Sequence, residues 1–140
     1  MKREASARWN GGFKDGSGVM STGSGAVKDL KYSAGTRFEN NPGSNPEELV
    51  AAAHAGCFSM ALSGQLDKAN LKAERIDTTA TLTMEKLDAG WTVTAIHLDV
   101  TAEVPGADDG AFQKAAENAK AGCPISRLLK AEISMTARLA

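Results

Sequence analysis

Aromatic residues are scarce in this sequence, at 5% of 140 residues, and there are only 4 prolines and 2 cysteines. An excess of one charge is also missing, because 16 Lys and Arg residues balance 17 Asp and Glu residues. A protein that coats a polyanion needs a clustered excess of cations, so this balance excludes that class and predicts no nucleic-acid partner. With few large side chains the core should be thin, which leaves room for a second copy of the chain to complete it.

Long hydrophobic runs are also missing, since no apolar run approaches the ~20 residues that a membrane helix needs. The start of the chain, Met1–Glu4, is basic but lacks the apolar stretch of a signal peptide. Hydrophobic residues make up 42% of the chain and charged residues 24%, as in ordinary globular domains. We therefore expect a single domain over residues 1–140, in the cytoplasm and without a membrane partner.

The two cysteines, Cys57 and Cys123, lie far apart in the sequence. In a reducing compartment such a pair is more often redox-active, metal-binding or simply buried than joined in a structural disulfide. Zinc needs four suitably spaced ligands, and neither a CxxC nor an HExxH motif is present. The glycine-rich segments lack the phosphate-loop pattern, and Ser59 lies outside any GxSxG motif. We expect no metal and no organic cofactor.

A long helix over Glu47–Lys68 is the best-specified element. Asn45 can cap its N-terminus, Pro46 suits the first helical position, and Glu48 follows Asn45 at capping-box spacing. The middle of the helix is apolar or small on nearly every face, which is typical of a buried helix. In a chain of this size, full burial suggests packing against a sheet and against a second subunit.

The remaining elements predict an α+β protein in the order strand hairpin, long central helix, strand hairpin, two helices and strand. The first strands are expected around Ala5–Trp9 and from Val19, with residues 30–38 ambiguous. Alternation predicts strands over residues 76–85 and 91–102, with a turn at Asp88–Gly90 and a bulge near Ala95. A helix from Asp108 or Asp109 to Gly122, a short helix after Cys123 and a strand over residues 133–139 complete the chain.

One stripe of the long helix combines a carboxylate, an imidazole and a thiol, from Glu47, His54 and Cys57. Two interpretations of Cys57 fit this pattern: a thiol whose ionisation is set by charged neighbours, or a buried cysteine that acts as a small hydrophobic residue. His54 is likewise either a base or an interior histidine. The pattern alone does not decide between them.

Cys123 directly precedes Pro124 at a predicted helix start, so it occupies an N-cap position. A thiolate there gains from exposed N–H groups and the helix dipole, which favours a disulfide-cycling hypothesis for the two cysteines. Arg37 could hold a thiolate ionised and hydrogen-bond a peroxide or carboxylate oxygen. The alternative for Arg37 is an exposed loop arginine.

Two long segments resemble the motifs of the osmotically inducible protein C (OsmC) family: Ser44–Leu62 (SNPEELVAAAHAGCFSMAL) and Ala119–Ile133 (AKAGCPISRLLKAEI). Thr36–Glu39 and Lys86–Gly90 match as well, so the similarity covers nearly the whole chain. The resemblance implies an OsmC-like α+β fold and an intertwined homodimer. It also implies a thiol-dependent peroxidase for oxidative or osmotic stress, related to the organic hydroperoxide resistance proteins.

The resemblance assigns roles by motif. Cys57 is then the peroxidatic cysteine, Cys123 the resolving cysteine, Arg37 the activator of the Cys57 thiolate and Glu47 the carboxylate that holds Arg37. The implied substrates are organic hydroperoxides and, more weakly, hydrogen peroxide, and the implied reductant is a dithiol of the lipoyl type. An apolar wall from Phe58, Met60 and nearby leucines would suit an alkyl hydroperoxide.

Two other functional classes stay open. A non-enzymatic, stress-induced binding protein with buried thiols predicts slow alkylation of both cysteines and no disulfide after peroxide treatment. A thiol hydrolase that uses Cys57 with His54 predicts an acyl-enzyme with activated esters and no need for Cys123.

Overall fold

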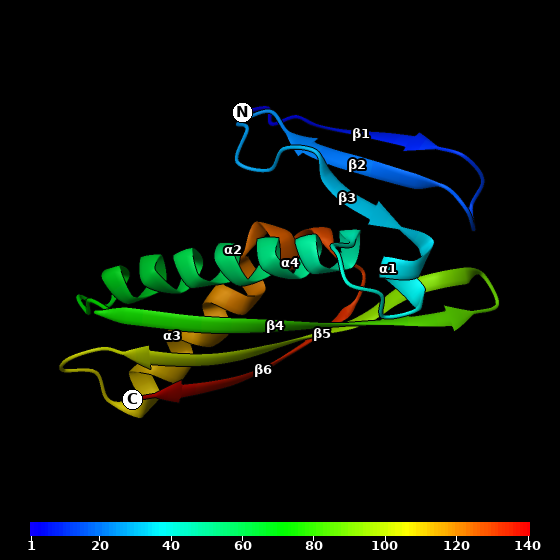
Figure 1. The fold of residues 1–140 in the computed structure, drawn as a ribbon. Helices are drawn as coiled ribbons and strands as arrows, with labels where there is room; N and C mark the ends of the chain where they lie inside the picture. Colours follow the sequence, from blue (N-terminus) through cyan, green and yellow to red (C-terminus); the bar gives the residue numbers. More distant parts are fainter. The chain divides into compact units, whose positions relative to one another are not determined.

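The computed structural model describes residues 1–140 as an α+β protein (Figure 1). The chain divides into two compact units, Met1–Leu49 and Val50–Ala140, and each contains one three-stranded sheet. The α+β class and the order of long helix, strand pair, two helices and final strand are as predicted. Before the long helix, the structure contains three strands and a short helix, where the sequence predicted only a two-stranded hairpin.

The first unit contains an antiparallel sheet of β1 (Ala5–Asn10), β2 (Ser17–Thr22) and β3 (Leu30–Ser33). A short helix, α1 (Ala34–Phe38), follows directly, so the ambiguous segment is half strand and half helix. The helix forms because Ser33 caps it: the Thr36 N–H donates to Ser33 Oγ at 3.2 Å, and the Ser33 N–H donates to Thr36 Oγ1 at 2.9 Å. The low helix propensity of Gly35 and Thr36 hides this helix in the sequence.

Helix α2 (Pro46–Lys68) starts and ends as predicted. Asn45 Oδ1 accepts a hydrogen bond from the Glu48 N–H at 2.8 Å, which satisfies one of the free N–H groups at the helix start. The predicted burial on all faces is not achieved in the single chain. One face of α2 is buried, and its fully covered residues are His54, Phe58, Leu62 and Leu66. On another face Met60 is 76% exposed.

By length and composition alone, α2 could cross a membrane. The prediction that no apolar run reaches this length is therefore wrong, because no Asp, Glu, Lys or Arg interrupts residues 49–66. The long helix of a protein core meets the same test, and α2 packs into a core through Phe58, Leu62 and Leu66.

The second unit contains a mixed sheet in the order β4 (Arg75–Leu87), β5 (Gly90–Glu103) and β6 (Glu132–Leu139). β4 and β5 are antiparallel, and Gly90 after the turn has φ 116°, a conformation that favours glycine. Thr83 pairs with Ala95 and Met84 pairs with Val93, so Thr94 is the extra residue of a bulge. The predicted bulge near Ala95 is confirmed to within one residue.

β6 runs parallel to β5, and a parallel pair needs a crossover connection. Helices α3 (Asp109–Gly122) and α4 (Pro124–Leu128) supply it. α3 begins at Asp109, one of the two predicted starts, and Asp108 caps it, because Asp108 Oδ1 accepts from the Ala111 N–H at 2.8 Å. Helices α2 and α3 and one face of the sheet enclose the core, which includes Phe58, Leu62, Leu66, Ile96, Leu98, Val100, Phe112 and Ala116.

Candidate active site

Cys57 and Cys123 meet in the second unit although 66 positions separate them. Cys57 lies in the middle of α2 and is half-buried, whereas Cys123 lies between α3 and α4 and is fully buried. Both thiols are free, and Cys123 Sγ donates to Cys57 Sγ at 2.8 Å. A disulfide bond is about 2.05 Å long, so a small movement of either side chain would be enough to form one.

The surroundings of Cys57 within this unit favour the neutral thiol. Burial raises the pKa of Cys57 above its ordinary value, and the neighbouring Cys123 thiol adds to the increase. The backbone N–H of Ile125, in the first turn of α4, opposes this increase by donating to the Cys57 sulfur. A thiolate at Cys57 therefore needs a cation beyond these neighbours.

Cys123 is the N-cap of α4, as predicted, and its own N–H closes α3 by donating to the Ala119 carbonyl at 2.9 Å. The Cys123 side chain makes no capping hydrogen bond. The Ile125 N–H, in the first turn of α4, donates to the Cys57 sulfur. The sequence did not predict this contact, because it depends on the tertiary packing of α4 against α2.

In the first unit, Arg37 on α1 and Glu47 on α2 form a two-point ion pair. Arg37 Nε donates to Glu47 Oε2 at 3.2 Å, and Arg37 Nη2 donates to Glu47 Oε1. This hydrogen bonding raises the pKa of Arg37, so the guanidinium stays charged. Asn45 ties the two elements together, because its Nδ2 donates to the Thr36 carbonyl at 3.4 Å while its Oδ1 caps α2.

An aromatic pocket of about 300 Å³ lies beside Arg37 in the same unit. Its lining residues are Trp9, Phe13, Tyr32, Ser33, Ala34, Arg37 and Phe38. The guanidinium carbon of Arg37 lies 4.9 Å from the centre of the Phe38 ring, in a cation–π contact. Sequence reasoning missed this pocket, and the available signal was the concentration of aromatic residues before residue 39.

The apolar wall predicted from Phe58 and Met60 is not a single surface. Phe58 is 0% exposed within the core, and Met60 is 76% exposed. Because successive helical residues are about 100° apart around the axis, side chains two positions apart point in nearly opposite directions. The aromatic pocket beside Arg37 is the better candidate for an apolar binding surface.

His54 on α2 is fully buried, and its Nε2 lies 2.8 Å from Ser126 Oγ on α4. Burial lowers the pKa of His54, so the imidazole is neutral near pH 7. No hydrogen bond joins His54 to Cys57. The thiol–imidazole pair that the hydrolase interpretation needs is therefore absent from this arrangement.

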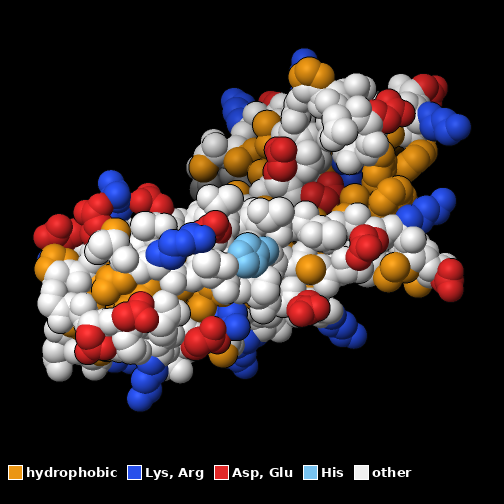
Figure 2. Space-filling view, turned by 90° about the horizontal axis from the view of Figure 1, so that it is seen from below, with side chains coloured by type: hydrophobic (Ala, Val, Ile, Leu, Met, Phe, Trp, Pro, Cys, Tyr) orange, Lys and Arg blue, Asp and Glu red, His pale blue; other side chains and the backbone are white.

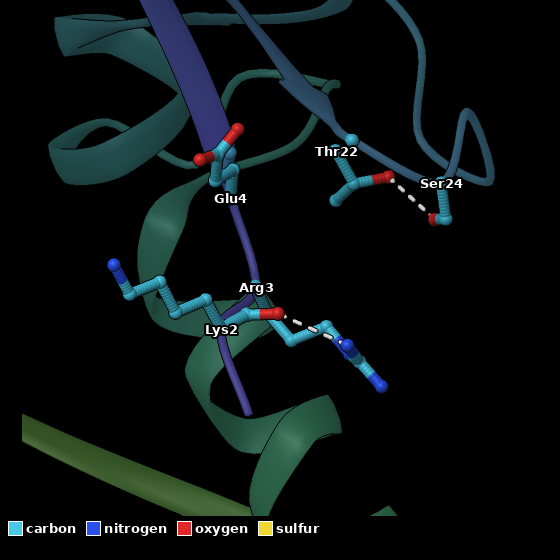
Figure 3. Close-up of a pocket in the computed structure, with 7 residues that line it drawn as sticks. Lys2, Arg3, Glu4, Thr22 and Ser24 are labelled. Carbon is cyan, nitrogen blue, oxygen red and sulfur yellow. Dashed lines mark hydrogen bonds between the residues drawn. The ribbon is translucent and has the colours of Figure 1, made fainter.

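Other surface features do not involve the candidate residues. No group of three or more His, Cys, Asp or Glu side chains is arranged to hold a metal ion. A hollow of about 560 Å³ near the N-terminus is lined by polar side chains such as Arg3 and Glu4, and Thr22 hydrogen-bonds Ser24 there (Figure 3). Basic and acidic side chains are intermixed on the face shown in Figure 2, unlike the clustered cations of a polyanion-binding surface.

Residues 39–138 match the family model described as OsmC-like protein. The chain belongs to the OsmC-like family. It is 47% identical to Peroxiredoxin OsmC from Escherichia coli (strain K12), over 99% of this chain and 97% of the relative. It is 30% identical to an organic hydroperoxide resistance protein from Xanthomonas axonopodis pv. citri, over 70% of this chain and 68% of the relative.

A solved structure has the same OsmC-like fold. The organic hydroperoxide resistance protein OhrB of Bacillus subtilis superposes with a TM-score of 0.71 and 21% identity, over 100% of this chain and 98% of that one. The family match includes Glu47, Cys57 and Cys123 and begins just after Arg37. The family membership and the α+β fold that the sequence motifs implied are thus confirmed.

Proposed function

We propose that this OsmC-like protein is a thiol-dependent peroxidase that reduces organic hydroperoxides, and hydrogen peroxide more slowly, in oxidative or osmotic stress. The observation that carries the proposal is the contact between the half-buried Cys57 thiol and the buried Cys123 thiol, whose sulfurs are 2.8 Å apart. The 47% identity to a peroxiredoxin over nearly the full length of both chains supports the same activity.

In the proposed cycle the Cys57 thiolate attacks the distal oxygen of the hydroperoxide. The O–O bond breaks, the alkoxide takes up a proton and leaves as an alcohol, and Cys57 becomes a sulfenic acid. Cys123 then attacks the Cys57 sulfur, hydroxide leaves with the Cys123 proton as water, and a disulfide forms. A dithiol reductant of the lipoyl type reopens it by thiol–disulfide exchange, so the cycle uses no metal or organic cofactor.

Arg37 is the proposed source of the cation that Cys57 needs. An opposite charge within about 4–6 Å lowers the pKa of an acid by roughly 1–3 units, which can offset the effect of burial on Cys57. Glu47 orients the guanidinium by binding Nε and Nη2, and Nη1 takes no part in that pair. Arg37 and Glu47 are therefore proposed as site residues together with Cys57 and Cys123.

The pocket beside Arg37 supports organic hydroperoxides as the preferred substrates. Its aromatic walls, from Trp9, Phe13 and Phe38, can bury the alkyl or aryl part of a small organic molecule. Hydrogen peroxide has no apolar part and gains nothing from such a surface. This difference in binding gives the expected order of reactivity.

We further propose a homodimer with the exposed face of α2 at its interface. That face carries small or apolar residues: Ala52, Ala53, Gly56, Met60 and Gly64. Small residues allow another helix to approach closely, and burial of the face removes apolar surface from water. The proposed location is the cytoplasm, where a dithiol reductant can keep the cysteines reduced. The chain is proposed to work as one OsmC-like domain, without a nucleic-acid or membrane partner.

Treatment of the reduced protein with stoichiometric cumene hydroperoxide tests this function. We expect both thiols to disappear, the intact mass to fall by the mass of the two thiol hydrogens, and Cys57 and Cys123 to be recovered in one linked peptide. Two unchanged thiols would favour the alternative, a non-enzymatic stress-induced binding protein with buried thiols.

A further inference from the structure

The hydrogen bond between His54 and Ser126 takes no part in the proposed cycle. Both side chains are buried: His54 is 0% exposed and Ser126 is 8% exposed. His54 Nε2 lies 2.8 Å from Ser126 Oγ, whereas His54 Nδ1 is buried without any hydrogen-bond partner. Ser126 is thus the only polar partner of a buried imidazole. A buried polar group of this kind is costly unless it is paired, so the contact strongly favours one arrangement of the two segments.

This hydrogen bond lies one helical turn away from the two thiols. His54 precedes Cys57 by three residues on α2, and Ser126 follows Cys123 by three residues along α4. The same two segments are therefore joined twice, by the sulfur pair at 2.8 Å and by the imidazole–hydroxyl pair at 2.8 Å. Two contacts a turn apart fix both the position and the direction of α4 relative to α2.

α4 needs such an anchor because it is only five residues long. At its two ends the Arg127 N–H donates to the carbonyl of the N-cap residue Cys123, and the N–H of the C-cap residue Leu129 donates to the Ile125 carbonyl. A single helical turn is unfavourable in isolation, because it fixes several backbone angles for few hydrogen bonds. Side-chain contacts to α2 must therefore stabilise the conformation that carries Cys123.

We propose that His54 and Ser126 are a positioning pair that holds the Cys123 thiol against Cys57 for the disulfide-forming step. The proposal rests on the two-cysteine function above. In that step Cys123 attacks the sulfur of the Cys57 sulfenic acid, the S–O bond breaks, and hydroxide leaves with the Cys123 proton as water. Holding two reacting groups together raises the rate of a step in proportion to their effective concentration. The pair acts mainly on this second step, in which α4 carries the attacking thiol, whereas in the first step α4 contributes only the Ile125 N–H that donates to Cys57.

Rapid-mixing kinetics on variants of the full-length protein separate the two steps. In Ser126→Ala and His54→Leu we expect the rate of sulfenic acid formation to stay within about twofold and the rate of disulfide formation to fall by about tenfold. The fraction of Cys57 that reaches sulfinic acid under excess peroxide should rise accordingly. Ser126→Thr, which restores the hydroxyl, and His54→Gln, which restores an N–H near the place of Nε2, should recover most of the disulfide rate.

Ser59→Ala is the matched control. It removes a hydrogen bond from the same helix, since Ser59 Oγ lies 2.8 Å from Thr78 Oγ1, but it does not involve α4. In this variant we expect the fractions of oxidised Cys57 that reach the disulfide and the sulfinic acid to equal those of the wild type. An unchanged disulfide rate in Ser126→Ala, or an equal loss of both rates in Ser126→Ala and Ser59→Ala, would overturn the positioning role.

Oxidation with diamide distinguishes failure of the pair from failure of the proposed function. Diamide joins two thiols without peroxide, so the rate of Cys57–Cys123 closure can be measured even if the wild type does not react with hydroperoxides. A wild type that is inert to hydroperoxides but closes about tenfold faster with diamide than Ser126→Ala overturns the peroxidase and supports the pair. Equal closure rates overturn the pair, whatever the outcome with hydroperoxide.

Discussion

Glu47 holds Arg37 through two parallel hydrogen bonds, from Nε to Oε2 and from Nη2 to Oε1. The pair joins α1 to the first turn of α2, ten residues later in the chain. Such a fork fixes both the position and the plane of the guanidinium, which a lysine cannot reproduce. The charge of Arg37 and the orientation of its guanidinium should therefore have separable effects on the pKa of Cys57 and on the rate of peroxide reduction.

Replacement of Arg37 tests the charge. Burial raises the pKa of Cys57, so without a cation the thiol should titrate above its ordinary value of about 8.5. We expect Arg37→Ala to slow alkylation of Cys57 at neutral pH by about tenfold or more and to move the midpoint of its pH profile upward. Arg138→Ala, which removes a surface arginine paired with Asp99, is the control and should leave the profile unchanged. Identical profiles in all three proteins would remove Arg37 from the site.

Glu47→Gln tests the geometry while keeping the arginine. The amide can hold only part of the fork, so the guanidinium keeps its charge and loses its fixed orientation. We expect peroxide reduction to fall by about tenfold, with a smaller upward shift of the Cys57 pKa than in Arg37→Ala. Glu48→Gln, one position along the same helix turn, is the matched control, and both effects should be absent there.

Cys123→Ser separates the reaction with peroxide from disulfide formation. Cys57 should still consume about one equivalent of hydroperoxide, because the first step needs only its own thiolate. With no resolving thiol, the variant should stall as a sulfenic acid and then gain a second oxygen under excess peroxide. Intact mass spectrometry measures both species. Repeated turnover with a dithiol and no accumulation of oxidised Cys57 would contradict the role of Cys123.

The buried His54 predicts a loss of stability in acid. Because burial lowers the pKa of His54 below its ordinary value of about 6.5, the unfolded chain binds this proton at a higher pH than the folded chain does. The contribution of neutral, buried His54 to the free energy of unfolding is therefore fully present above about pH 6.5. It is lost as the pH falls through the folded-state pKa. We expect His54→Gln to flatten the decline in unfolding free energy below pH 6.5. Denaturant titrations at several pH values measure this slope, and an equal slope in both proteins would contradict the prediction.

Gly56→Leu tests the proposed dimer. A Cβ at Gly56 would meet no atom within 4 Å, and leucine is a better helix former than glycine, so the fold of the single chain should tolerate the change. A bulky side chain on this face should prevent close helix packing and shift the protein toward monomer. Sedimentation velocity measures the shift. Gly122→Leu, also into open space but at the end of α3, should leave the oligomeric state unchanged.

The long helix could be predicted nearly to the residue, since its signals are local. Asn45, Pro46 and Glu48 mark the start, and the apolar run defines the length. The bulge beside Ala95 was visible for a similar reason, because a change of alternation phase is a property of one strand. Features that depend on adjacent residues are thus accessible from sequence.

The site itself depends on contacts between distant residues. Nothing in the sequence brings Cys123 to Cys57, because that contact follows from how the crossover between β5 and β6 packs on α2. The aromatic pocket arises from residues on β1, β3 and α1 and from the segment after β1, and no periodic pattern links them. The sequence left His54 open between a base and an interior histidine, and its buried contact with Ser126, 72 residues away, decides for the interior role.

The place of Cys123 in a crossover has a consequence for the chain as it leaves the ribosome. α2 and the β4–β5 hairpin are synthesised before Cys123, and β6 can complete the sheet only afterwards. Contacts between residues distant in sequence form late, because their loops must close first. On the proposed chemistry, a growing chain exposes Cys57 before it has a resolving thiol. A growing chain that is oxidised at Cys57 would therefore have no route to the disulfide until Cys123 has been synthesised.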